Sequence, residues 1–281
     1  MSKVIFWTGL NNVLKTKAKI SLDLNGSRAN EKNSSSYFTE DGTHKALTYD
    51  WIYNRYVIWK HLTYQSILQQ DTPYDLYVLV CHIKSKAIIE EIFKEELAND
   101  PKLKILYNHC DSFEGECLIL TEKATKEDPV YLVRIDSDDC YHPNVCKKLL
   151  SLDVSKTPKF ISFNHGYNYD YKNNVMEIRN YKKEPYTPPL YASKNTEPVS
   201  TLDQGGNHVK IQKKKPMYLN DIPYFLFNIT GMNVTWSIGR RRNRTKAGDK
   251  LIKNTKEYSK ILKSFGMQDH YDALKKETFK T

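Results

Sequence analysis

Three aspartates within four residues, Asp136, Asp138 and Asp139, have the clearest capacity for chemistry in this sequence. They follow the apolar run at 130–135, which predicts a buried strand. Ligands of parallel α/β sheets bind beyond the carboxyl ends of the strands. Two like charges ~4 Å apart repel by roughly 4 kcal/mol at an effective dielectric constant near 20, so the cluster needs compensation.

A divalent cation with oxygen ligands would compensate these carboxylates and would also bridge them to phosphate oxygens. Mn²⁺ or Mg²⁺ suits the cluster better than zinc, because no His/Cys ligand set is evident. The alternative is that an aspartate caps the helix predicted at 143–152. One aspartate is enough for a cap, so three of them favour a metal and nucleotide site.

The elements expected to position this cluster alternate along the first half of the chain. Apolar runs predict strands, and near-helical spacing of apolar residues predicts helices between them. This alternation predicts an α/β fold with a mostly parallel sheet and right-handed crossovers. The expected strands lie at 3–9, 76–83, 103–107 and 130–135, and the expected helices at 49–70, 85–98, 116–126 and 143–152.

The second half of the chain changes in character. A segment rich in Pro, Ser, Thr and Gly at 185–206 predicts a long loop over a cleft. The apolar residues of 250–265 fall broadly on one side of a basic amphipathic helix, which favours packing on the core over membrane contact. Further strands are expected at 160–163, 175–180, 209–212 and 228–236.

Composition limits the classes of protein that fit the sequence but does not single out one of them. The chain has 281 residues, of which 40% are hydrophobic and 27% charged, so a packed core is expected. Its net charge of +10 attracts phosphates of nucleotides, nucleic acids or anionic membranes alike. The five cysteines form no CxxC pair, which predicts reduced thiols. With no signal peptide or membrane-spanning run expected, the predicted location is the cytoplasm, with peripheral contact at the inner face of the membrane through the basic C-terminal region.

Residues 133–139, Val-Arg-Ile-Asp-Ser-Asp-Asp, are followed by a His-Pro-Asn helix start and resemble the DxD region of GT-A glycosyltransferases. They are more closely similar to a bacterial rhamnosyl transferase family, in which an Arg-hydrophobic-Asp-Ser-Asp-Asp string recurs. The helix and strand at 55–77 resemble that family too, so the resemblance covers roughly 49–150. It implies a GT-A-like fold, a Rossmann-like mixed sheet flanked by helices. It also implies metal-dependent transfer of a hexose, rhamnose in that family, from a nucleotide-sugar to a glycan or lipid-linked acceptor.

The resemblance assigns roles to individual residues of the cluster. Asp136 lies on the ribose or nucleotide side, Asp138 is the direct metal ligand, and Asp139 supports the metal or contacts the sugar. Arg134 either contributes to the donor site or pairs with a carboxylate and holds the loop. GT-A enzymes often add a late histidine to the metal ligands, which makes His208 a candidate.

Other candidates lie outside the cluster. Thr8, at the end of the first predicted strand, and Arg240, in the basic run at 240–244, are expected to contact the nucleotide-sugar. An inverting transferase needs a general base for the acceptor hydroxyl. The candidates are Asp170, Glu197, Asp203 and Asp221 of the second half, of which Glu197 and Asp203 sit in the loop expected on the acceptor side. Residues 1–152 would then form the donor half and residues 153–281 the acceptor half of one compact domain.

Two other function classes compete with this reading. A metal-dependent nucleotidyltransferase also uses clustered aspartates, but it usually carries a Gly-rich phosphate loop that Gly9-Leu10-Asn11-Asn12 does not supply. A non-enzymatic polyanion- or nucleic-acid-binding protein would suit the positive charge. Its basic residues should gather on one face, whereas here they are scattered, so no nucleic-acid partner is expected.

Overall fold

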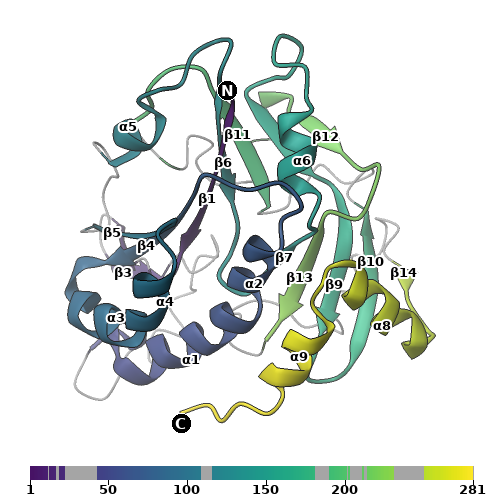
Figure 1. Ribbon diagram of the computed structural model, residues 1–281. Helices are drawn as coiled ribbons and strands as arrows, with labels where there is room; N and C mark the ends of the chain where they lie inside the picture. The colour runs from purple at the N-terminus through teal and green to yellow at the C-terminus, as the bar shows by residue number, and fades with distance from the viewer. Residues whose placement is uncertain are drawn as a thin grey trace.

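The computed structural model describes residues 1–11, 13–16, 19–22, 43–108, 116–180, 190–200, 202, 211, 214–230 and 250–280. Two β-sheets lie side by side, with helices packed against them (Figure 1). A separate two-stranded ribbon pairs β2 (Val13–Thr16) with β3 (Lys19–Leu22).

The larger sheet has seven strands in the order β12-β8-β11-β6-β1-β4-β5. Strands β6, β1, β4 and β5 are parallel to one another, and β11 runs antiparallel between β6 and β8. Strands from both halves of the chain therefore share one sheet. Their bounds are β1 Lys3–Gly9, β4 Leu76–His82, β5 Leu103–Asn108, β6 Val130–Arg134, β8 Phe160–Phe163, β11 Tyr191–Asn195 and β12 Met217–Leu219.

The smaller sheet has five strands in the order β14-β10-β9-β13-β7. Its strand β7 begins directly after the aspartate cluster and pairs with β13, so the cluster lies where the chain passes from one sheet to the other. The bounds are β7 Cys140–Tyr141, β9 His165–Asp170, β10 Val175–Asn180, β13 Phe225–Ile229 and β14 Lys250–Leu251.

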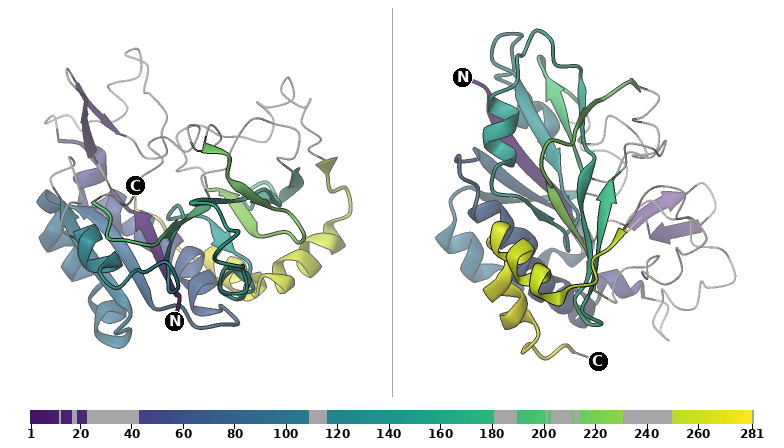
Figure 2. Two further views of the ribbon diagram at one scale, coloured as in Figure 1. Left: turned by 90° about the horizontal axis from the view of Figure 1, so that it is seen from above. Right: turned by 90° about the vertical axis from the view of Figure 1, so that its right-hand side faces the viewer.

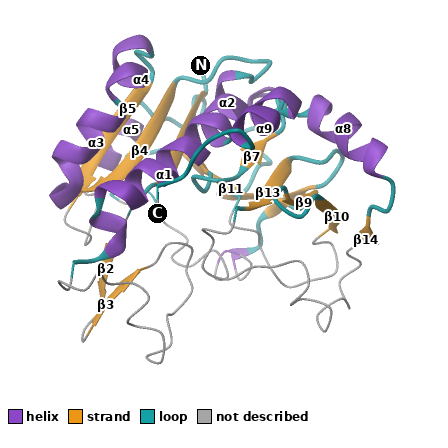
Figure 3. Cartoon of the chain, turned by 90° about the horizontal axis from the view of Figure 1, so that it is seen from below, coloured by secondary structure: helices purple, strands orange, loops and turns teal. Residues whose placement is uncertain are grey.

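Most described helices lie on one side of the two sheets, as Figure 3 shows for α1 to α4, α8 and α9. Helix α1 reaches both sheets, since its buried residues belong to the core cluster under each of them. The other face of β1, β4 and β6 packs against Cys117 of α5. The bounds are α1 Tyr49–His61, α2 Thr63–Leu68, α3 Lys86–Ile92, α4 Lys94–Asn99, α5 Glu116–Thr121, α6 Val145–Leu150, α8 Thr255–Ser264 and α9 Gln268–Leu274, with short 3₁₀ turns at Lys45–Leu47 and Ile83–Ser85.

The central strands are apolar on both faces because both faces are covered. In β1, Val4 and Phe6 pack under the helices, whereas Ile5 and Trp7 pack on the opposite face. The mixed α/β sheet flanked by helices is thus confirmed, together with the predicted strands at 3–9, 76–83, 103–107, 130–135, 160–163 and 175–180 to within a residue or two at their ends.

The predicted loop at 185–206 is wrong in its middle, where β11 (Tyr191–Asn195) pairs with β6 and β8. Its sequence, Tyr-Ala-Ser-Lys-Asn, carries little strand propensity. Strands β6 and β8 lie on either side of this segment and supply its backbone hydrogen-bond partners, so it forms a strand despite its low propensity. Burial of Tyr191, Ala192, Ser193 and Asn195 is the consequence.

Helix boundaries differ from prediction where local contacts interrupt the pattern. The predicted helix at 250–265 begins only at Thr255, because Lys250–Leu251 pairs with β10 and Asn254 caps the helix by accepting from the Lys256 N–H. The expected packing on the core is confirmed by the burial of Tyr258 and Leu262. The predicted helices at 49–70 and 85–98 are each divided, the second at buried Phe93.

Two strand predictions of the second half lie partly outside the described residues. The strand expected at 228–236 begins earlier, as β13 (Phe225–Ile229), and 231–236 are outside the described ranges. Of 209–212, only Ile211 is described, and it is buried. The described cysteines, Cys81, Cys117, Cys140 and Cys146, are free thiols. None of the described helices combines the length and apolarity needed to cross a bilayer.

Candidate functional site

Residues 136–139, here called the acidic loop, follow β6 at the carboxyl end of the parallel strands. The loop is a turn in which the Asp139 N–H donates to the Asp136 carbonyl at 3.1 Å. The strand order reverses at β1, since β4 and β5 lie on one side of it and β6 on the other. The acidic loop therefore lies at the topological switch point, where open α/β sheets bind ligands.

Arg55 of α1 holds the middle of the acidic loop from the helix side. Its Nε donates to Ser137 Oγ at 2.6 Å, and its Nη1 lies 3.2 Å from Asp138 Oδ2. The Arg55 and Asp138 side chains are only 3% and 1% exposed. Thr63 of α2 adds a bond from its hydroxyl to the Asp136 carbonyl at 3.2 Å. The loop is thus fixed to the two helices by buried polar contacts.

Arg134, the last residue of β6, holds the start of the acidic loop. Its Nη2 lies 3.2 Å from Asp136 Oδ1, which is the carboxylate pairing expected from the sequence. The register aligns Trp7 of β1, Arg134 and Tyr191 of β11 across three adjacent strands. The guanidinium carbon lies 5.9 Å from the Trp7 ring centroid and 6.0 Å from that of Tyr191. A cation between two aromatic rings therefore borders the loop.

Asn228 of β13 fixes the far end of the acidic loop. Its main-chain N–H donates to Asp139 Oδ1 at 2.9 Å, and its Nδ2 donates to the Asp138 carbonyl at 2.6 Å. The Tyr271 hydroxyl of α9 donates to Asn228 Oδ1. Asn228 and Tyr271 are both fully buried. The aspartates are consequently held by three separate parts of the chain, α1–α2, β6 and β13, and α9 holds Asn228 in turn.

Burial and mutual repulsion shift the acids of the loop. Burial raises the pKa of Asp136, and the Asp138 charge adds to this, against the opposing effects of Arg134 and Arg55. Burial also raises the pKa of Asp139 well above its ordinary value, reinforced by the charges of Asp138 and Asp136. Both directions mean that the loop disfavours additional negative charge and favours a proton or a cation nearby.

The donor set of the loop suits a hard divalent cation. Asp136 and Asp138 offer carboxylate oxygens, and each guanidinium contacts one oxygen of its carboxylate, which leaves the other oxygen as a potential ligand. Asp139 Oδ2 is buried without a hydrogen-bond partner. Within the described ranges, however, no three His, Cys, Asp or Glu side chains form a group that could hold a metal. Further ligands would have to come from a phosphate, from water or from the rest of the chain.

Thr8 lies at the end of β1 but faces away from the Trp7–Arg134–Tyr191 row. It is fully buried, and its hydroxyl lies 2.9 Å from the Tyr77 hydroxyl. Tyr77 also accepts from Trp59 Nε1 at 2.7 Å. The alternation of strand side chains explains this placement, since Trp7 and Thr8 must point to opposite faces. Its assignment to the nucleotide-sugar stays a prediction.

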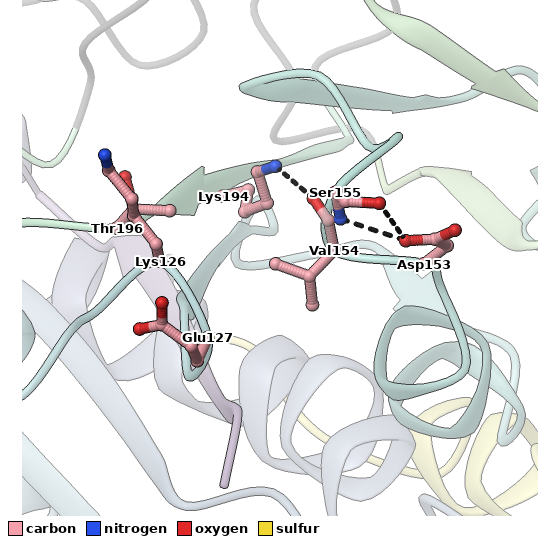
Figure 4. A pocket seen from close by; sticks show the side chains of 7 residues that line it. All are labelled: Lys126, Glu127, Asp153, Val154, Ser155, Lys194 and Thr196. Carbon is pink, nitrogen blue, oxygen red and sulfur yellow. Dashed lines mark hydrogen bonds between the residues drawn. The ribbon is translucent and has the colours of Figure 1, made fainter.

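Glu197 does not lie beside the acidic loop. Because β11 is antiparallel to β6, with Asn195 opposite Val130, the residues after β11 lie at the other end of β6. A pocket of about 570 Å³ occupies that end (Figure 4), and Lys194 and Thr196 line it. Lys194 Nζ donates to the carbonyls of Val154, at 2.7 Å, and Thr157, so it holds a loop there. The structure therefore does not bring Glu197 to the aspartates.

Three other predicted site residues, Asp203, His208 and Arg240, lie outside the described residues. Conversely, the structure adds Arg55, Asn228 and Tyr271 to the surroundings of the aspartates. Arg55 belongs to the stretch that carries the family resemblance, which was the one available signal for it. Asn228 and Tyr271 lie about 90 and 130 residues beyond the loop, and no spacing rule links them to it.

Comparisons with known proteins give distant structural matches. No family model matches the sequence, and neither does any curated protein. Among solved structures, S. aureus TarS 1–349 in complex with UDP-GlcNAc matches over 84% of this chain and 62% of that chain, with 11% identity and a TM-score of 0.44. TarS 1–349 alone matches over 80% and 60%, with 14% identity and a TM-score of 0.40. The chain thus spans about three fifths of these TarS structures. Matches at this TM-score do not establish a shared activity.

Proposed function

We propose that this protein is a nucleotide-sugar glycosyltransferase whose donor binds at the acidic loop. The observation that carries the proposal is the placement of Asp136, Asp138 and Asp139 at the switch point of the parallel strands of the larger sheet. A nucleotide bound in that crevice lies beyond the carboxyl ends of β1 and β6. An acidic cluster there suits a diphosphate only if a cation intervenes, which is the arrangement that nucleotide-sugar enzymes of this kind need.

In this proposal, Asp136 and Asp138 hold Mn²⁺ or Mg²⁺. Bound there, the cation would neutralise charge on the departing nucleoside diphosphate. Asp136, at the start of the loop, would face the nucleotide, and the Trp7–Arg134–Tyr191 row would border the bound nucleotide. Arg55 orients Asp138, since the two side chains form a buried ion pair.

The reaction forms a bond between an acceptor hydroxyl oxygen and the sugar's anomeric carbon. The bond from that carbon to the diphosphate oxygen breaks, and the hydroxyl proton passes to a base. Asp203 stays the candidate base, and His208 and Arg240 stay candidates for the metal and the diphosphate. Rhamnose as the hexose, and a glycan or lipid-linked saccharide as the acceptor, are proposed on the family resemblance. Peripheral membrane contact through the basic C-terminal region is proposed on its charge.

The test is calorimetry with nucleoside diphosphates in Mn²⁺, in Mg²⁺ and in EDTA. Tight binding is expected only with a cation, because the carboxylates otherwise repel the phosphates. A nucleotide-sugar at a hundredfold excess over its Kd should also stabilise the protein by ~2.7 kcal/mol, which a thermal-shift panel detects. Equal affinity in EDTA would remove the cation from the site.

Product analysis separates the proposal from its nearest competitor. A glycosyltransferase releases nucleoside diphosphate when supplied with a nucleotide-sugar and an acceptor. A nucleotidyltransferase instead releases pyrophosphate from a nucleoside triphosphate and a sugar phosphate. Pyrophosphate release without any sugar transfer would replace the proposed activity by that one.

A further inference from the structure

The C-terminal helix α9 contacts the acidic loop through a chain of two buried residues. The Tyr271 hydroxyl donates to Asn228 Oδ1, and Asn228 Nδ2 donates to the Asp138 carbonyl at 2.6 Å. Tyr271 also lies 4.0 Å from Cys140 Sγ, the residue that follows the loop. Figure 1 shows α9 beside α1, which carries Arg55, and near the lower end of β13, which carries Asn228.

We infer that Tyr271 is a positioning residue, which sets the acidic loop in its ligand-binding conformation by orienting the Asn228 side chain. An amide side chain presents its oxygen to one side and its NH₂ to the other. A hydroxyl donor on the Oδ1 side directs Nδ2 toward the Asp138 carbonyl. The inference rests on the proposed function only for the identity of the ligand, a divalent cation.

The Asn228 backbone makes the link tighter. Its main-chain N–H donates to Asp139 Oδ1 at 2.9 Å, so one residue binds a side chain and a main-chain carbonyl of two successive aspartates. A shift of Asn228 therefore moves both Asp138 and Asp139. Groups that orient metal ligands through hydrogen bonds commonly change metal affinity by 10–100-fold when they are removed.

The segment that carries Tyr271 is anchored on α1, the helix that carries Arg55. Beyond α9, His61 lies 2.8 Å from Glu277, and Asn54 exchanges two hydrogen bonds with the Lys280 backbone at 2.7 and 2.8 Å. Lys280 Nζ also lies 4.2 Å from the Tyr49 ring centroid. The same stretch of chain thus braces the acidic loop from the Asn228 side and the Arg55 side together.

The chain offers a matched control in Tyr258 of α8. Both tyrosines are buried, and both pack edge-on against Tyr169, with centroids at 5.1 Å for Tyr271 and 6.2 Å for Tyr258. The Tyr258 hydroxyl accepts from the Met176 N–H and donates to the Ile252 carbonyl. Neither bond leads to the aspartates. Tyr271→Phe and Tyr258→Phe therefore remove comparable buried hydroxyls, and only the first touches the loop network.

The experiment has two readouts on the full chain, taken at a temperature where circular dichroism shows every variant folded. The first is the Mn²⁺ Kd from the electron paramagnetic resonance of unbound Mn²⁺. The second is hydrogen exchange of the amides at 136–140 by mass spectrometry. Tyr271→Phe should raise the Mn²⁺ Kd by about tenfold and speed exchange in the loop, whereas Tyr258→Phe should change neither.

The outcomes separate this inference from the proposed function. An unchanged Mn²⁺ Kd in Tyr271→Phe overturns the positioning role, as does an equal change in both variants. If the unsubstituted protein binds no Mn²⁺, the metal part of the proposed function fails, and exchange decides the inference. Faster loop exchange in Tyr271→Phe alone then supports it, and unchanged loop exchange overturns it.

Discussion

Two arginine–aspartate pairs hold the acidic loop at the same distance but in different surroundings. Arg55–Asp138 and Arg134–Asp136 each have an N···O separation of 3.2 Å. The first pair is 3% and 1% exposed, and the second 14% and 10%. Arg55 also donates a hydrogen bond to Ser137 Oγ, whereas Arg134 lies between two aromatic rings.

The comparison shows that two ion pairs with the same N···O distance contribute differently to the stability of the protein. Breaking a buried ion pair by removing one partner leaves an uncompensated charge, whereas a pair with solvent contact contributes far less. Arg55–Asp138 is therefore the structural support of the loop, and Arg134–Asp136 is the pair that borders the proposed donor. The distinction predicts opposite patterns of stability and binding for substitutions in the two pairs.

Replacing Arg55 should produce the largest effect. Arg55→Met keeps an unbranched, mostly apolar side chain but leaves the Asp138 carboxylate buried without its cation, so the free energy of unfolding should fall by about 3–5 kcal/mol. Urea denaturation measures this. Arg134→Met is the matched control and should cost less, because the Arg134–Asp136 pair is more exposed to solvent than Arg55–Asp138. Equal losses in both variants would abolish the distinction between the pairs.

Replacing the aspartates should separate stability from activity. Asp136→Asn should reduce transfer by about a hundredfold to a thousandfold, or ~3–4 kcal/mol, because it removes a preorganised electrostatic contact to the departing diphosphate. Its unfolding free energy should change little. Asp138→Asn should lose activity and also stability, since it leaves Arg55 buried without a counter-charge. Rates and urea curves on the same preparations test this, and an active Asp136→Asn enzyme would exclude Asp136 from the site.

The smallest effect is expected at the aromatic row. Arg134→Lys keeps the charge but loses the planar group between Trp7 and Tyr191, so nucleoside diphosphate binding should weaken by ~0.5–1 kcal/mol, about two- to fivefold. Calorimetry at constant Mn²⁺ measures it. Arg55→Lys is the counterpart: it should lower stability more than binding. A reversal of these two patterns would exchange the roles assigned to the pairs.

The sequence predicts the central part of the fold better than its edges. The continuous apolar runs of β1, β4 and β6 are readable because those strands are buried on both faces. Strand β11 cannot be predicted from its sequence, because only Tyr191 of its five residues is β-prone and the segment becomes a strand between two established neighbours. Local pattern cannot report a partner that lies elsewhere in the chain.

The same limit applies to the site. The aspartates are adjacent in the sequence, so their proximity and their need for compensation are predictable. Arg55 is 83 residues from Asp138, and in a helical pattern it reads as a surface charge. Glu197 shows the opposite problem, since its place in the loop expected on the acceptor side was the argument for it. The direction of β11 carries it to the far end of the sheet.

The contacts of Glu277 and Lys280 with α1 have a consequence for how the protein folds during its synthesis. Asn54 and its hydrogen-bond partner Lys280 are 226 residues apart in the chain, and Asn228 and its partner Tyr271 are 43 residues apart. Each partner is therefore synthesised well after the asparagine that it binds. At the usual rate of translation, about 5–20 residues per second, the interval between the synthesis of Asn54 and Lys280 is roughly 10–50 s. Tyr271 follows the acidic loop by about 130 residues, so for roughly 7–26 s the aspartates exist without it. A chain terminated before residue 271 therefore carries the loop sequence but lacks the Tyr271 hydroxyl that binds Asn228.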